Sequence, residues 1–168
     1  MIPGVEVREL VRHEDDRGWL IETWRDVGRW PPFVQDNLSS SRAGVVRGLH
    51  YQVRRPQGKL VYVVRGAIFD VVVDLRRTSP AFGTWAGFEL SAENRRQLWI
   101  PPGCAHGFQA LADAEVAYKL TSAYDPADER AVRWDDPDLA ITWRRPQDAR
   151  VSPRDAAAPF LRDAELPP

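Results

Sequence analysis

The stretch Lys59-Leu-Val-Tyr-Val-Val-Arg-Gly66-Ala-Ile-Phe-Asp-Val-Val-Val-Asp-Leu75 decides the fold class of this chain. It contains two valine-rich runs, Lys59–Arg65 and Ala67–Leu75, which are separated by Gly66. Branched and aromatic residues favour strands, and a glycine between two such runs is typical of a tight turn. We therefore expect a β-hairpin here. In the second run two aspartates alternate with apolar residues, which predicts one apolar face and one partly polar face.

Similar short segments occur along the rest of the chain, with glycine and proline at their boundaries. We expect further strands at Trp19–Trp24, Phe33–Asn37, Val45–Gln52, Thr84–Leu90, Gln97–Ile100, Gly107–Leu111 and Glu115–Ser122. Only two short helical pieces are expected, one at Ser91–Arg95 and one that begins at Ser152. Many short strands with few helices predict an all-β sandwich or barrel, with a jelly roll as the preferred architecture and short peripheral helices.

Composition bounds the class of protein. The 168 residues are 43% apolar and 28% charged, which predicts one globular domain over residues 1–168. The formal net charge of −1 favours neither nucleic acid nor an anionic membrane as a partner. Cys104 is the only cysteine, which excludes an internal disulfide and a thiolate metal site. No apolar run reaches bilayer length and no signal peptide is apparent, so we expect a cytoplasmic protein.

The segment Arg47-Gly48-Leu49-His50-Tyr51-Gln52 and the following Gln57-Gly58-Lys59-Leu60 place a histidine and a lysine on two strands. A histidine can accept a proton at neutral pH, and a lysine can stabilise a developing oxyanion. Arg47 and His50 have opposite parity, so a regular strand would direct them to opposite faces. A bulge at Gly48 would let both face one cavity. This pattern indicates proton abstraction beside a carbonyl group.

The segment Pro101-Pro-Gly-Cys-Ala-His106 resembles half of a cupin metal motif. The other half would need a second histidine two residues after His50, but Gln52 occupies that position. Two histidines without a carboxylate partner rarely make a tight transition-metal site. We therefore expect a barrel without a metal and without another cofactor.

Two further candidates have ordinary structural explanations. Tyr118 and Tyr124 are six residues apart and could be an aromatic stripe of the core, although Asp125-Pro126 indicates that the strand stops near Tyr124 and leaves its ring at the rim. Ser152-Pro153-Arg154-Asp155 is typical of a helix start, and N-terminal capping alone would explain the aspartate.

At this point the chain closely resembles the dTDP-4-dehydrorhamnose 3,5-epimerase family. The resemblance covers nearly the whole chain and rests on many ordered motifs, namely Asp16–Gly18, Phe33–Asn37, Arg47–Gln52, Gln57–Leu60, Leu90–Phe108, Tyr118–Pro126 and Asp155–Pro159. It implies a cupin-type jelly-roll barrel that holds no metal and forms a homodimer.

The resemblance also implies roles for individual residues. His50 would be the base, Asp155 its orienting carboxylate, Tyr118 the proton donor on the opposite face of the sugar, and Lys59 the group that stabilises the enolate. Tyr124 would stack on the thymine ring. Further nucleotide-sugar contacts would be Arg17, donated across the dimer interface, and Glu22, Gln35, Asn37, Arg47, His106, Glu129 and Arg154. The chain departs from the family at Arg154, which is commonly lysine, and at Ala123, which is often aromatic.

The expected reaction is epimerisation of dTDP-4-dehydro-6-deoxy-D-glucose at C3 and C5 through an enolate, giving dTDP-4-dehydro-L-rhamnose. Three alternatives remain open. The first is an epimerase that acts only at C3 or only at C5, as in antibiotic-sugar pathways. The second is a metal-dependent cupin oxygenase, which the missing ligands disfavour. The third is a non-catalytic sugar-binding cupin, which would not need a base, an acid, a lysine and a carboxylate together.

Overall fold

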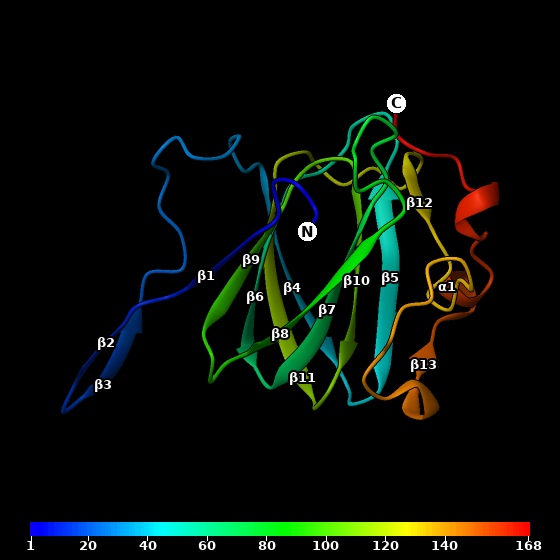
Figure 1. The fold of residues 1–168 in the computed structure, drawn as a ribbon. Coiled ribbons are helices and arrows are strands. Elements are labelled where there is room, and N and C mark those ends of the chain that lie inside the picture. The colour runs from blue at the N-terminus through cyan, green and yellow to red at the C-terminus, as the bar shows by residue number, and fades with distance from the viewer.

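Two antiparallel sheets face each other and enclose the interior of the molecule (Figure 1). The computed structural model describes all residues from 1 to 168. The first sheet has five strands in the order β1 (Glu6–Glu9), β9 (Arg96–Ile100), β6 (Lys59–Arg65), β11 (Ala114–Leu120) and β4 (Gln35–Ser41). This double-sheet arrangement is a jelly roll, as the number of short strands predicts.

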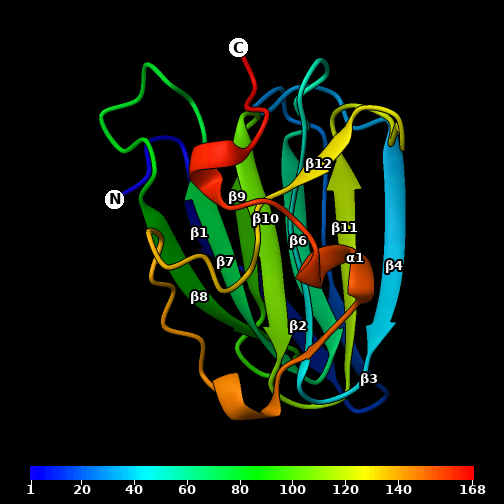
Figure 2. The ribbon, with the colours of Figure 1, turned by 90° about the vertical axis from the view of Figure 1, so that its right-hand side faces the viewer.

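The second sheet forms the opposite wall and carries the C-terminal part of the chain on its outer face. Its strands run in the order β12 (Glu129–Ala131), β5 (Val45–Gln52), β10 (Cys104–Ala110), β7 (Ala67–Asp74) and β8 (Trp85–Ser91), and β13 (Arg150–Val151) also pairs with β5. The short helices η1 (Pro146–Asp148), α1 (Pro153–Ala156) and η2 (Leu161–Asp163) lie along the orange-to-red segment that crosses this sheet in Figure 2.

The prediction of a hairpin at Gly66 is wrong. The two valine-rich runs are strands, β6 and β7, but they belong to opposite sheets and do not pair with each other. Gly66 has a φ of +76°, and a Cβ atom there would lie 2.1 Å from the carbonyl oxygen of Asp113. Only glycine fits this conformation and this close approach, so the chain turns a corner of the barrel at this position. β6 then pairs with β9 and β11, whereas β7 pairs with the next strand, β8, and with β10.

The other expected elements are largely confirmed, with shifted ends. The Val45–Gln52 strand is confirmed at both ends, and the helix after Ser152 is confirmed as α1. The helix expected at Ser91–Arg95 is wrong, because Ser91 ends β8 and Asn94 closes a turn by accepting a hydrogen bond from the backbone N–H of Ser91. Asparagine favours such local bonds over helical ones. The strands β1, β2, β12 and β13 were not expected from the sequence.

Apolar side chains fill both faces of the second sheet. Between the sheets lies a core that includes Val61, Ile68, Val72, Leu98 and Val116. A second core lies outside, where Phe69 and Val71 of β7 meet Trp143 of the C-terminal segment. Both faces of β7 are therefore buried, and Asp70 and Asp74 are fully buried rather than exposed on a polar face. No helix is long and apolar enough to cross a membrane.

One element stands apart from the barrel. The strands β2 (Arg12–Asp15) and β3 (Gly18–Ile21) pair only with each other and form an arm that projects away from the two sheets (Figure 1). The side chains of Trp19 and Leu20 on this arm are 62% and 66% exposed. An isolated two-stranded ribbon is marginal in water, so the arm needs a surface to pack against.

Candidate active site

A cavity of about 570 Å³ opens between the two sheets at one end of the barrel. The first sheet contributes side chains from β4, β6 and β11, and the second sheet contributes side chains from β5 and β10. The cavity brings together nine of the residues selected from the sequence: Gln35, Asn37, Arg47, His50, Lys59, His106, Tyr118, Tyr124 and Glu129. A smaller adjoining hollow adds Arg154 and Asp155. Most of the site expected from the sequence is therefore one contiguous polar surface.

A histidine and a carboxylate form the centre of this surface. His50 Nε2 lies 2.7 Å from Asp155 Oδ1, and the other oxygen of Asp155 accepts a hydrogen bond from the backbone N–H of Gly48 at 3.3 Å. Burial alone would raise the pKa of Asp155, but its hydrogen bonds bring that pKa below the ordinary value. The carboxylate thus stays ionised, orients the imidazole and leaves the other ring nitrogen for a substrate.

Asp155 combines the two features considered from the sequence, a place in a helix start and a contact with His50. It occupies the third residue of the Ser152 helix start, and its backbone N–H donates to the Ser152 hydroxyl at 3.1 Å. The helix start therefore uses the backbone of Asp155 and the hydroxyl of Ser152, while the carboxylate is free to bind His50. Capping and orientation of the histidine do not compete, because different atoms carry them.

The bulge expected at Gly48 is confirmed. The pairing of β5 with β10 matches His50 to His106 but Arg47 to Phe108, so β5 contains one extra residue. Gly48 has a φ of +120°, and a Cβ atom there would lie 2.6 Å from the Cα atom of Gly107. As a result both Arg47 and His50 line the same cavity. Local backbone geometry thus places a cation beside the base.

Lys59 lies at the beginning of β6 in the first sheet. It is 7% exposed, and its Nζ is 3.4 Å from the carbonyl oxygen of His50. Burial lowers the pKa of Lys59 to about 8, against the opposing influence of Glu129 and Asp70. A lysine held in a partly dry cavity is a strong stabiliser of negative charge that develops nearby.

A second histidine–carboxylate pair lies beside the first, and the sequence reasoning missed its carboxylate. His106 Nε2 is 2.8 Å from Asp70 Oδ2, and the imidazole of His106 faces His50 across the β5–β10 pair. Burial raises the pKa of Asp70 and lowers that of His106. The signal available in the sequence was an aspartate inside a valine-rich strand, because a buried carboxyl group needs a partner.

The rim of the cavity carries an aromatic ring and a linked group of charges. Tyr124 donates a hydrogen bond to Glu129 at 3.1 Å, and Glu129 also forms an ion pair with Arg154. The Tyr124 residue is 43% exposed, so the ring faces solvent at the mouth. Tyr118, by contrast, lies on β11 inside the cavity. The expectation that the strand stops near Tyr124 is confirmed, with the end at Leu120, so that Tyr124 lies outside β11.

Arg17 and Glu22 are not brought to the cavity by their own chain. Arg17 lies at the tip of the arm, where it pairs with Asp15 and its side chain is 85% exposed. Glu22 follows β3 and pairs with Arg25. The cavity and its adjoining hollow therefore hold every selected residue of the same chain except these two.

No group of three or more His, Cys, Asp or Glu side chains is arranged to hold a metal ion. What the cavity offers instead is a proton-transfer set: an imidazole held by a carboxylate, a phenol on the opposite sheet and a buried lysine. The fold is a jelly-roll barrel of the cupin type, and these groups have the chemistry needed to accept a proton, donate a proton and stabilise negative charge.

The chain belongs to the dTDP-4-dehydrorhamnose 3,5-epimerase family, whose family model matches residues 1–163. It is 47% identical over 174 residues to the dTDP-4-dehydrorhamnose 3,5-epimerase of Pseudomonas aeruginosa, an alignment that covers 99% of this chain and 96% of the relative. The chain is also 46% identical to a dTDP-4-dehydrorhamnose 3-epimerase from Streptomyces niveus, in an alignment that covers 99% of this chain and 86% of the relative.

Solved structures give the same result. The crystal structure of a dTDP-6-deoxy-D-glucose-3,5-epimerase from Legionella pneumophila, in complex with dTDP-4-keto-L-rhamnose, superposes with a TM-score of 0.93 at 45% identity and covers 97% of this chain and 92% of that one. A 4-keto-6-deoxy sugar epimerase from Streptomyces spheroides also gives a TM-score of 0.93, at 40% identity, and covers 99% of this chain and 89% of that one.

Proposed function

We propose that this protein epimerises dTDP-4-dehydro-6-deoxy-D-glucose at C3 and C5 and gives dTDP-4-dehydro-L-rhamnose. One observation carries the proposal: His50 and Tyr118 line one cavity from opposite sheets. A flat sugar ring between them would present one face to a base and the other face to an acid. Inversion at carbon needs this arrangement, because the proton leaves from one face and returns on the other.

The chemistry follows from the C4 carbonyl group. The hydrogens at C3 and C5 are acidified by this carbonyl, so His50 can take either one while the C–H electron pair moves into an enolate with its charge on the C4 oxygen. Lys59 in its ammonium form would hold that oxygen, an interaction worth about 3 kcal/mol in comparable oxyanion sites. Tyr118 then delivers a proton to the carbon from the other face and the carbonyl is regenerated. No electrons are gained or lost over the cycle.

The remaining residues would bind the nucleotide. Arg47 supplies a cation inside the cavity, and its guanidinium is fixed by hydrogen bonds to Ser41 and to the backbone of Ser40. Guanidinium groups suit the paired oxygens of a diphosphate. The ring of Tyr124 at the rim is free to stack on the thymine base. The other contacts would come from Gln35, Asn37, His106, Glu129 and Arg154, all of which lie at the cavity or its adjoining hollow.

A homodimer would complete the site. The arm exposes apolar side chains that its own barrel does not cover, and it carries Arg17 away from its own cavity. A second copy that packs against the arm would bury these side chains and could receive Arg17 and Glu22 at its cavity. A twofold dimer in which each arm serves its neighbour meets both requirements.

Two broader expectations accompany the proposal. Residues 1–168 would form a single epimerase domain, which is supported by the packing of the C-terminal segment on the second sheet. A cytoplasmic location is supported by Cys104, which is buried and unpaired, because free thiols persist in reducing compartments.

An epimerase that acts at C3 alone is the second candidate, because the similar protein from Streptomyces niveus is named as a 3-epimerase. Incubation with dTDP-4-dehydro-6-deoxy-D-glucose in heavy water separates the two. Deuterium at both carbons supports the 3,5-epimerase, and deuterium only at C3 or only at C5 supports a single-site enzyme. No exchange at either carbon would overturn the proposal and leave a binding protein.

A further inference from the structure

The loop of residues 121–128, which connects β11 to β12 and is called the rim loop here, presents Tyr124 to the cavity without strand or helix of its own. Glutamine side chains hold four consecutive residues of its backbone, and the first contact is from Gln57 Nε2 to the carbonyl oxygen of Ser122 at 2.8 Å. The N–H of Tyr124 donates to Gln35 Oε1 at 2.8 Å, and the N–H of Asp125 donates to Gln52 Oε1 at 2.8 Å. The carbonyl oxygen of Ala123 accepts from Gln52 Nε2 at 3.5 Å.

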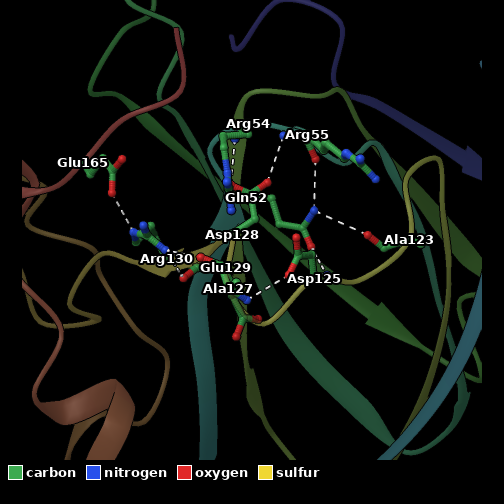
Figure 3. A network of polar contacts seen from close by, with 10 residues as sticks. All are labelled: Gln52, Arg54, Arg55, Ala123, Asp125, Ala127, Asp128, Glu129, Arg130 and Glu165. Atoms are coloured by element: carbon green, nitrogen blue, oxygen red, sulfur yellow. Dashed lines mark hydrogen bonds and ion pairs between the residues drawn. The ribbon is translucent and has the colours of Figure 1, made fainter.

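Gln52 contacts this loop but not the cavity. It is the last residue of β5, is 1% exposed, and does not line the cavity. Its amide nitrogen also donates to the carbonyl oxygen of Arg55 at 3.1 Å, so both ends of the amide are used (Figure 3). Only a primary amide of this length supplies a donor and an acceptor to backbone groups in this way. Loss of the amide would leave the N–H of Asp125 without its partner.

The far end of the rim loop is anchored independently. The carboxylate of Asp128 accepts hydrogen bonds from the backbone N–H groups of Arg54 and Arg55, both at 2.9 Å (Figure 3). The carbonyl oxygen of Asp125 in turn accepts from the N–H of Glu129 at 3.0 Å. The contacts of Gln52 lie on both sides of Tyr124, at Ala123 and Asp125, so removing its amide should loosen the backbone that carries the ring while the loop stays attached at Asp128.

We propose that Gln52 is a positioning residue for nucleotide binding, which holds the rim loop so that the Tyr124 ring is preset for stacking. This inference rests on the proposed stacking role of Tyr124. It assigns Gln52 to substrate affinity and not to proton transfer. A ring that is already ordered loses less conformational freedom when the ligand binds, so the amide should act mainly on KM and on the affinity for the nucleotide.

The test compares Gln52→Met with Gln109→Met. Gln109 is also fully buried and holds a loop by the same two contacts, with Arg145 O at 2.7 Å and with the Arg145 N–H at 2.9 Å. It lies opposite Val46, at the other end of β5 and away from the cavity lining. Both variants should lose thermal stability. Only Gln52→Met should raise KM for the dTDP-sugar and Kd for dTDP, by roughly 5- to 20-fold, with kcat within about twofold of wild type.

A double-mutant cycle with Tyr124→Ala completes the test. If Gln52 acts through the ring, Gln52→Met should add little to the loss of dTDP affinity caused by Tyr124→Ala. Independent, multiplying effects would overturn the inference, as would a Gln52→Met variant whose KM matches that of Gln109→Met. Gln52→Glu retains the oxygen that accepts from the N–H of Asp125, so its KM should lie between those of wild type and Gln52→Met. This variant replaces Gln52→Met in the test if Gln52→Met does not fold. If Tyr124→Ala binds dTDP as wild type does, the proposed stacking role fails and this inference fails with it, whereas the epimerase activity itself is tested separately by exchange in heavy water.

Discussion

The Nε2 atom of His50 and the Oδ1 atom of Asp155 are 2.7 Å apart, although 105 positions of sequence separate the two residues. His50 lies in the wall of the barrel on β5, whereas Asp155 lies in α1 on the segment that crosses outside the second sheet. The orientation of the proposed base therefore depends on a segment that is not part of the barrel. Changes that displace the Asp155 carboxylate should affect proton transfer even where they leave the cavity lining intact.

His50→Ala should abolish both inversion and hydrogen exchange, because no other group would remove the proton from that face. Tyr118→Phe keeps the base, so it should still exchange substrate hydrogen for deuterium while forming much less inverted product. Losses of about 10²- to 10⁴-fold are typical for a general acid or base. Mass spectrometry of the substrate and product pools measures both quantities.

Circular dichroism and thermal melts must first show that these two variants are folded, because Tyr118 also packs against the interior core. A folded His50→Ala protein that exchanges at a rate near wild type would disprove the assignment of the base. His106, which faces His50 and has its own carboxylate partner, would then be the first alternative to test.

Asp155→Asn should reduce kcat to a level between those of wild type and His50→Ala, because it removes the charge that orients and stabilises the imidazolium. Ser152→Ala is the matched control. It removes the hydroxyl that accepts from the Asp155 N–H and should cost about 1 kcal/mol of stability as an N-cap loss, while kcat stays near wild type. Equal losses of kcat in the two variants would show that Asp155 acts only through the helix start.

The kcat/KM profile should fall as pH rises through about 8, because burial lowers the pKa of Lys59 to about 8 and only the ammonium form stabilises the enolate. Lys59→Met should have a low kcat/KM that does not fall further as pH rises through about 8. The contribution of Lys59 to the free energy of unfolding changes with pH in the opposite direction to its contribution to activity. Between about pH 8 and the ordinary lysine pKa near 10.5, the unfolded chain binds more protons, so this residue makes folding more favourable as pH rises. Denaturant melts of wild type and Lys59→Met at pH 8 and 10 measure the difference, and an unchanged fall of kcat/KM with pH in Lys59→Met would refute the assignment.

Mixing two inactive variants tests the dimer. Arg17→Ala lacks the donated guanidinium and His50→Ala lacks the base, so each homodimer should be weak or inactive. If arms are exchanged, a mixed dimer contains one intact site, and random mixing of equal amounts should restore about one quarter of all sites. Equilibrium sedimentation should show a dimer at micromolar concentration. A mixture no more active than its components, or a fully active monomer, would contradict arm exchange.

Activity should survive dialysis against a chelator and should not rise when a divalent metal is added. The reason is the donor set: Gln52 stands where a second histidine ligand would be required, and its amide is engaged by the rim loop. Loss of epimerase activity on chelation, with recovery after addition of one particular metal, would refute this expectation.

Much of the site was predictable because its residues lie in short motifs with local geometry. The bulge at Gly48 follows from the opposite parity of Arg47 and His50, and the helix start at Ser152 follows from its cap and proline. The pairing of Asp70 with His106 was not predictable in the same way, because it depends on which strands become neighbours. Gln52 was interpreted only as a missing ligand, since its contacts with the rim loop join β5 to residues 71 and 73 positions away.

The wrong prediction of a hairpin at Gly66 also comes from not knowing which strands become neighbours. Strand propensity and a glycine between two runs define two strands and a turn, but they do not say whether the strands pair with each other or part at a corner. The strand β2 was missed for a different reason: it is polar throughout and fully exposed, so it has no apolar alternation to recognise, whereas its partner β3 overlaps the expected strand Trp19–Trp24. The apolar side chains exposed on β3 agree with the proposed packing of the arm against a second copy.

The corner at Gly66 also sets the order in which this chain can fold. β6 pairs with β9 and β11, and β7 pairs with β8 and β10, so two adjacent valine-rich runs cannot shield each other as a local hairpin would. During synthesis on the ribosome, β6 emerges well before its partners β9 and β11, whereas β7 can pair with β8 before β10 is available. Closure of such distant contacts is slow, and unpaired apolar strands are prone to aggregate in the interval. The corner that gives the barrel its two walls therefore leaves β6 without a partner strand until the second half of the barrel has been synthesised.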